Sequence, residues 1–133
     1  MPNIEQFVPL LTVYDVQRSV DFYVGVLGFQ VERQHPSDGP PSWATLRRGD
    51  VKLMLNDEFE PDERRAEHDR LRSDDVSFYL WTKGLEAVHA LLVGQGCKVG
   101  ELRTEYYGMK QFDLHDPDGY RLTLQAPADE DAE

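Results

Sequence analysis

The sequence contains a single cysteine and no long apolar run, and each of these absences excludes a class of protein. Cys97 alone can form neither an internal disulfide nor an all-cysteine metal site, so we expect a cytoplasmic location. No run of about 18 apolar residues occurs, and no basic segment followed by an apolar one opens the chain. We therefore expect neither a membrane span nor a secretion signal.

Basic residues are also scarce, with 14 lysines and arginines against 25 aspartates and glutamates. The resulting net charge of -11 at pH 7 opposes binding to nucleic acid or to an anionic membrane, and favours a neutral or cationic partner. The 133 residues, 40% of them hydrophobic, suit one compact domain over residues 1–133.

The first half of the chain combines strand patterns with one helical pattern. Apolar residues recur at helical spacing from Val16 to Leu27, with Asp15 as a plausible N-cap and Gly28 as the stop. Runs rich in β-branched and apolar residues predict strands at residues 7–13, 29–35, 42–48 and 51–56.

The second half repeats this order. Strands are predicted at residues 75–81, 96–105, 109–115 and 120–125, with a helix from Thr82 as N-cap through Leu92. Gly28 and Gly96 each follow a predicted helix, and they lie about half a chain apart, which indicates an internal duplication. We predict an α+β fold of two tandem βαβββ modules, residues 5–56 and 75–126, with a charged linker at 57–74 and an acidic tail at 127–133.

Strand alternation predicts which side chains face the helices. The apolar set expected in the core comprises Val51, Leu53, Leu55, Val76, Phe78, Leu80, Phe112, Leu114, Leu122 and Leu124. Aromatic, charged and amide side chains then share the opposite face of what we expect to be a curved mixed sheet. Such a mixture is typical of a concave ligand cavity, although a dimer interface or a half-solvated sheet face remains an alternative.

Two segments together carry a resemblance to a known family. The segments "VPLLTVYDVQRSVDFYVGVLGF" and "YGMKQFDLHDPDGYRLTL" resemble the vicinal oxygen chelate superfamily and, within it, the glyoxalase/bleomycin-resistance group. The resemblance spans about residues 7–126 and agrees with the duplicated order of elements. The turn at Asp116–Gly119 matches the family's last turn.

In the metal-using members of this superfamily, several strands each supply one His or Glu ligand. The resemblance places these positions on Val8, Met54, Asp75 and Thr123. Of these four, Asp75 alone has a strong donor, and one carboxylate cannot hold a catalytic divalent ion. None of the histidines is spaced as part of a ligand pair: His35, His68, His89 and His115. We therefore predict no metal and no cofactor.

The bleomycin-resistance branch of the group resembles this chain more closely. Its members sequester an antibiotic as dimers, with an exchanged N-terminal strand and ligand grooves at the subunit boundary. The resemblance implies that Tyr79, Trp81 and Tyr107 stack on flat heteroaromatic rings. We predict a metal-independent homodimer that binds a small, planar or cationic, bleomycin-like molecule. The predicted ligand-binding residues are Trp43, Met54, Asp75, Tyr79, Trp81, Tyr107, Asp113 and Thr123.

Two other functions stay open from the sequence. The first is an enzyme of the same superfamily, a lyase, isomerase or dioxygenase with an atypical metal site around Asp75 and with Glu105 or Asp113 available for proton transfer. The second is a regulatory or immunity module that uses the cavity as a partner interface.

Overall fold

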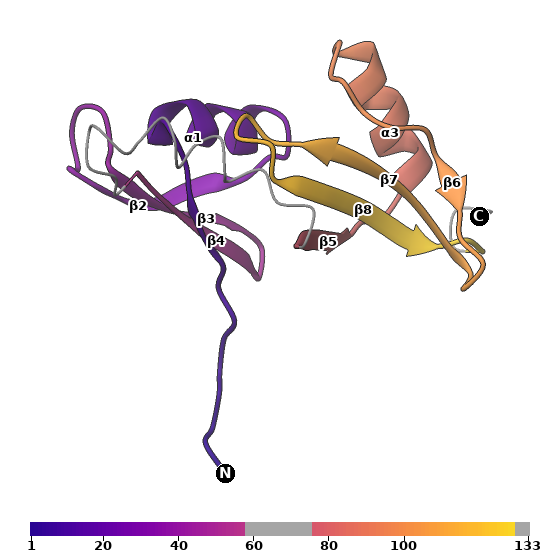
Figure 1. The fold of residues 1–133 in the computed structure, drawn as a ribbon, viewed down its shortest axis with the longest axis horizontal. Coiled ribbons are helices and arrows are strands. Elements are labelled where there is room, and N and C mark those ends of the chain that lie inside the picture. The colour runs from indigo at the N-terminus through magenta and orange to yellow at the C-terminus, as the bar shows by residue number, and fades with distance from the viewer. Residues whose placement is uncertain (58–75, 130–133) are drawn as a thin grey trace. The chain divides into compact units, whose positions relative to one another are not determined.

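The computed structural model describes residues 1–57 and 76–129, which divide between two compact units. We name these units the first module, within Met1–Arg72, and the second module, within Ser73–Glu133. Each contains one four-stranded mixed sheet and one described helix (Figure 1). The predicted linker beyond Asp57, the end of the predicted acidic tail, and Asp75 lie outside the described residues.

The first module has the strand order β1-β4-β3-β2, with β1 parallel to β4 and the other pairs antiparallel. Its helix begins after Asp15, whose carboxylate accepts a hydrogen bond from the Arg18 amide at 3.2 Å, so the predicted N-cap is confirmed. Its elements are β1 (Leu10–Thr12), α1 (Val16–Gly25), β2 (Gln30–His35), β3 (Trp43–Arg48) and β4 (Val51–Asn56).

The second module repeats this topology with the order β5-β8-β7-β6. β5 is parallel to β8, as β1 is to β4, and the other pairs are again antiparallel. Its elements are β5 (Ser77–Trp81), α3 (Leu85–Gly94), β6 (Arg103–Thr104), β7 (Met109–His115) and β8 (Arg121–Pro127). The predicted α+β fold of two βαβββ modules is therefore confirmed.

Equivalent local contacts occur in both modules. Gly28 and Gly96 lie shortly after the ends of α1 and α3 and have positive φ angles of 76° and 80°, which a residue with a Cβ rarely adopts. The amide of Val13 donates to the carbonyl of Asn56 at 2.8 Å, and the amide of Thr82 donates to that of Gln125 at 2.9 Å. Asn56 and Gln125 thus occupy equivalent positions on β4 and β8.

The core of each module lies between its helix and one face of its sheet. α1 packs on β2, β3 and β4, and α3 packs on β7 and β8. Phe112, Leu114, Leu122 and Leu124, which were predicted in the core, are all buried. Val51 and Val76 were predicted in the core but are 48% and 51% exposed, because Val51 is the first residue of β4 and Val76 precedes β5.

Three predicted elements differ from the structure. The first strand covers Leu10–Thr12 instead of residues 7–13, since Pro9 has no amide hydrogen to donate and contributes its carbonyl to Met54. Within residues 96–105, strand structure is confined to Arg103–Thr104 and a bridge from Val99 to Leu114. Thr82 does not cap α3, because its hydroxyl donates to the Leu80 carbonyl and Gly84 is the N-cap.

None of the helices in the described ranges is long and apolar enough to cross a membrane.

Candidate functional site

The sheet face of the second module that points away from α3 carries most of the predicted site residues; we name it the polar face. Alternation along β7 sends Phe112 toward His89 of α3, with ring centroids 4.8 Å apart, and so sends Gln111 and Asp113 the other way. The strand register then builds two rows across the sheet. One row contains Arg103, Gln111, Gln125 and Trp81, and the other contains Asp113, Thr123 and Tyr79.

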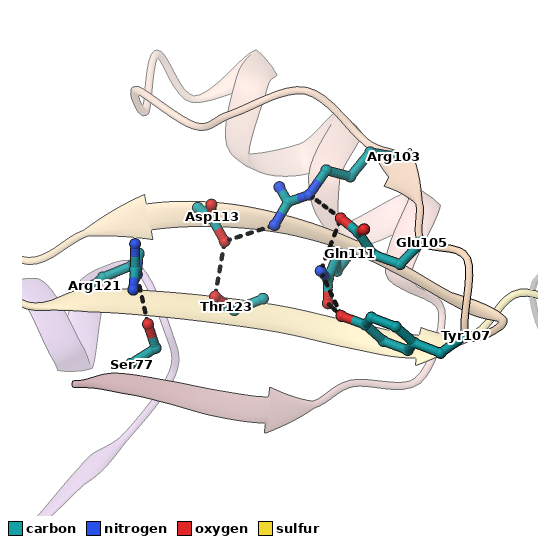
Figure 2. A network of polar contacts seen from close by, with 8 residues as sticks. All are labelled: Ser77, Arg103, Glu105, Tyr107, Gln111, Asp113, Arg121 and Thr123. Atoms are coloured by element: carbon teal, nitrogen blue, oxygen red, sulfur yellow. Dashed lines mark hydrogen bonds and ion pairs between the residues drawn. The ribbon is translucent and has the colours of Figure 1, made fainter. Parts of the chain in front are cut away.

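Arg103 joins two carboxylates at the edge of this face (Figure 2). Its Nε lies 2.6 Å from Glu105 Oε1, and a terminal guanidinium nitrogen lies 3.3 Å from Asp113 Oδ1. Partial burial works to lower the pKa of Arg103, but hydrogen bonds and charge from the two carboxylates outweigh it and raise that pKa above the ordinary value. One cation is therefore already paired with both acids.

The side chains in the middle of the network are buried, and hydrogen bonds to their neighbours fix their orientation. Thr123, 1% exposed, donates its hydroxyl to Asp113 Oδ1 at 2.7 Å. The Gln111 amide nitrogen donates to Glu105 at 3.2 Å and to the Tyr107 hydroxyl at 3.1 Å, as Figure 2 shows. Because each side chain restrains the next, Asp113, Glu105 and Tyr107 are held in place before any ligand arrives.

Three aromatic side chains border this network with their rings open to solvent. Tyr79, Trp81 and Tyr107 are among the exposed large hydrophobic residues, and Trp81 reaches 69% exposure. Tyr106 contacts Tyr107 edge to face, with ring centroids 5.0 Å apart. Exposed aromatic rings beside oriented polar groups can stack on a flat molecule and hydrogen-bond its edge.

Trp43 and Met54, the other described residues predicted for the site, lie in the first module. Trp43 pairs with Asn56 and Met54 with Thr45, so both side chains share the sheet face that points away from α1. Asn56 is buried, and its Oδ1 has no hydrogen-bond partner among residues 1–57 and 76–129. The structure thus groups the described predicted residues into two sets, one in each module.

The metal-ligand positions of the superfamily do not fit a catalytic metal in the described part of the chain. Val8 has no donor atom, Met54 offers a thioether, and the Thr123 hydroxyl is already bonded to Asp113. Residues 1–57 and 76–129 contain no group of three or more His, Cys, Asp or Glu side chains that could hold an ion. We therefore derive no chemical step through a metal.

Several polar residues at this site were not among the predicted ligand-binding residues, among them Arg103, Gln111 and Gln125. Strand alternation had placed Gln111 and Gln125 on this face, and their burial is what reveals their part in it. Arg103 lies in a two-residue strand whose pattern is too short to read from sequence. The sequence did contain one indication of its role: Arg103 lies two positions before Glu105, a residue of opposite charge.

The model of the glyoxalase/bleomycin resistance protein/dioxygenase superfamily matches residues 4–124. The chain therefore belongs to this superfamily. No curated protein sequence matches it significantly.

Solved structures with the same fold include several antibiotic-binding proteins. TnmS3, an antibiotic binding protein from Streptomyces sp. CB03234, is 25% identical with a TM-score of 0.73, over 96% of this chain and 98% of that one. The bleomycin-binding protein from Streptomyces verticillus, complexed with copper(II)-bleomycin, is 22% identical with a TM-score of 0.67, over 93% and 97% of the two chains. The bleomycin resistance determinant encoded on transposon Tn5 is also 22% identical, with a TM-score of 0.69 over 93% and 98%.

Proposed function

We propose that this protein binds and sequesters a small planar organic molecule of the bleomycin-like antibiotic type, by a mechanism that requires no metal. The observation that carries the proposal is the polar face, where three exposed aromatic rings border a pre-oriented hydrogen-bond network. Rigid flat rings bury a large ligand area at a small cost in side-chain entropy. Similarity to TnmS3 and to bleomycin-binding proteins supports the same choice of ligand class.

Binding suits this face better than turnover does. Asp113 and Glu105, the candidates for proton transfer, both accept hydrogen bonds from Arg103, and each accepts another from Thr123 or Gln111. A general base has to accept a proton from a substrate, and these carboxylates already accept hydrogen bonds from donors within the protein. The net charge of -11 supports a ligand that is cationic as a whole.

Titration with metal-free bleomycin tests the proposal directly. We expect saturable quenching of tryptophan fluorescence together with a measurable heat of binding. Trp81→Leu should weaken binding by about tenfold, because the stacking surface is lost, while Trp81→Phe should retain most of the affinity. Absence of both quenching and heat at high micromolar bleomycin would remove this antibiotic as the ligand.

Elemental analysis of protein purified without chelator separates this proposal from the enzyme alternative. We expect no stoichiometric nickel, zinc, manganese or iron. Stoichiometric metal that disappears in Asp75→Ala would instead establish a metal site at that residue and overturn the metal-independent mechanism.

We also propose that the protein acts as a homodimer through its N-terminal segment, residues 1–9. This segment runs away from the sheet of the first module in Figure 1, and its apolar side chains Ile4 and Phe7 are exposed. Between it and the β3–β4 hairpin lies a cavity of about 470 Å³. Exposed apolar side chains and poor packing favour burial against a second copy.

A further inference from the structure

The end of β5, the two residues that follow it and the end of β8 enclose a small pocket beside Trp81, one of the rings of the proposed stacking function. Its volume is about 290 Å³, and its lining consists of Trp81, Thr82, Lys83, Gln125 and Ala126. All five residues belong to the second module, so the pocket is complete within that unit.

Gln125 gives this pocket a hydrogen-bond acceptor that has no donor among the described residues. Its side chain is 7% exposed, and the buried Oε1 accepts no hydrogen bond in the described structure. A buried carbonyl oxygen without a donor is unfavourable, and a ligand that supplies the donor recovers that loss on binding. Gln125 lines the pocket, so a rotation of its side chain would turn this oxygen toward an N–H group held in the pocket.

Two further side chains, Trp81 and Lys83, restrict the kind of ligand that can present this N–H group. Trp81 pairs with Gln125 across β5 and β8 and offers an exposed indole on the same sheet face. Lys83 makes no ion pair or hydrogen bond with any described residue, so its ammonium group is available to an acceptor on the ligand. Thr82 contributes no free donor, because its hydroxyl is bonded to Leu80 and its amide to Gln125.

We propose that this pocket binds a neutral aromatic carboxamide or lactam edge, with the ring on Trp81, the N–H on Gln125 Oε1 and the carbonyl oxygen toward Lys83. The inference rests on the proposed binding function and names the chemical group that one end of the ligand presents. It also places a limit on charge, because the ammonium group of Lys83 repels a cation at this end even where the ligand is cationic elsewhere.

The internal duplication supports a role for the acceptor. Asn56 occupies the equivalent position on β4, is paired with Trp43, and also has a buried side-chain oxygen without a donor. A buried amide oxygen without a donor among the described residues therefore occurs at the same strand position in both modules, whereas the neighbouring indole comes from β3 in the first module and from β5 in the second. The repeated feature is the amide oxygen.

Fragment titrations with matched probes test this inference. Protein labelled with 5-fluorotryptophan gives separate ¹⁹F resonances for its two tryptophans, Trp43 and Trp81, which single Trp→Phe variants assign. We expect benzamide to shift the Trp81 resonance and to bind about tenfold more tightly than N,N-dimethylbenzamide, which has no N–H donor. Benzamidine, a cation of the same shape, should bind more weakly than benzamide.

Variants assign these preferences to the two side chains. Gln125→Leu should abolish the preference for benzamide over its dimethyl analogue, and Lys83→Met should abolish the preference for benzamide over benzamidine. The exposed residues Gln95 and Lys98 provide the controls Gln95→Leu and Lys98→Met, which should leave both preferences unchanged. Equal binding of benzamide and its dimethyl analogue, or a preference that survives Gln125→Leu, would overturn the inference.

Bleomycin titrations of the same variants separate this inference from the proposed function. Bleomycin binding that is unaffected by Gln125→Leu would leave the function in place and remove the pocket from it. Carboxamide selectivity at Gln125 without any bleomycin binding would keep the pocket and remove bleomycin as the ligand.

Discussion

At the scale of single residues, Thr123 has a clear structural role. The superfamily resemblance aligns it with a metal-ligand position, and its hydroxyl instead donates to Asp113 at 2.7 Å from an almost fully buried position. A hydroxyl in this place fixes the orientation of a carboxylate on the polar face. Any contribution of Thr123 to ligand binding should therefore act through Asp113.

Replacing Thr123 with valine tests this role. Thr123→Val keeps the side-chain shape but removes a buried donor, so we expect the free energy of unfolding to fall by about 1–2 kcal/mol in urea denaturation. Thr123→Ser keeps the hydroxyl and should retain most of the stability. Thr104→Val, at an exposed strand position, should change little. If Thr123→Ser lost as much as Thr123→Val, methyl packing and not the hydrogen bond would be responsible.

Arg103 predicts how the network depends on pH. Its pKa is raised in the folded state above the ordinary arginine value, so the stability it contributes is fully present below that ordinary value and is lost only as the pH rises through the folded value. The loss caused by Arg103→Gln, at most about 1 kcal/mol for so exposed a pair, should be the same near pH 8 and near pH 9. Urea denaturation at the two pH values measures it, and a difference between them would assign the effect to another titrating group.

At the scale of secondary-structure elements, the sequence predicted best where alternation runs over a whole strand. β4 and β7 were predicted with their observed bounds, because apolar and polar residues alternate along each of them. The segment at residues 96–105 was predicted as a strand from its composition. β6 occupies two of those residues, since strand formation there depends on pairing with β7 and not on local propensity.

The candidate site was predictable in part for the same reason. Alternation identified the face that holds Tyr79, Trp81, Asp113 and Thr123, and the strand register confirms that they share it. It could not reveal that Gln125 is buried without a donor or that Arg103 joins two carboxylates. Those properties arise from contacts between strands that are distant in the sequence.

Two glycines at the ends of α3 should respond oppositely to replacement by alanine. Gly84 caps this helix with a φ of 64°, and a Cβ added there would meet no atom within 4 Å, so Gly84→Ala should destabilise the protein by about 1–2 kcal/mol through backbone strain alone. Gly94 ends the same helix without a positive φ and with equal space for a Cβ. Gly94→Ala should therefore stabilise the protein by about 0.5–1 kcal/mol. Thermal unfolding of both variants measures the contrast, and equal effects would contradict this account of Gly84.

At the scale of the whole molecule, the negative charge is unevenly distributed along the chain. About half of the acidic residues lie in residues 58–75 and 129–133. The polar face itself combines Arg103 and Arg121 with Glu105 and Asp113, so its local charge is close to balanced. The acidic charge should therefore speed the approach of a cationic ligand, while aromatic and amide contacts determine which ligand stays bound.

Removal of the N-terminal segment tests the proposed dimer. Light scattering should give about twice the chain mass of 15.3 kDa for the full chain and the monomer mass for a variant without residues 1–8. Phe7 is 91% exposed, so Phe7→Asp should also favour the monomer, because it removes apolar area that association buries and adds a charge that would lose its water. Gln6→Ser, a change at the neighbouring exposed position, should leave the mass unchanged. A full chain that stays monomeric at high micromolar concentration would contradict the dimer and leave the ligand contacts within the second module unaffected, because those contacts require one chain alone.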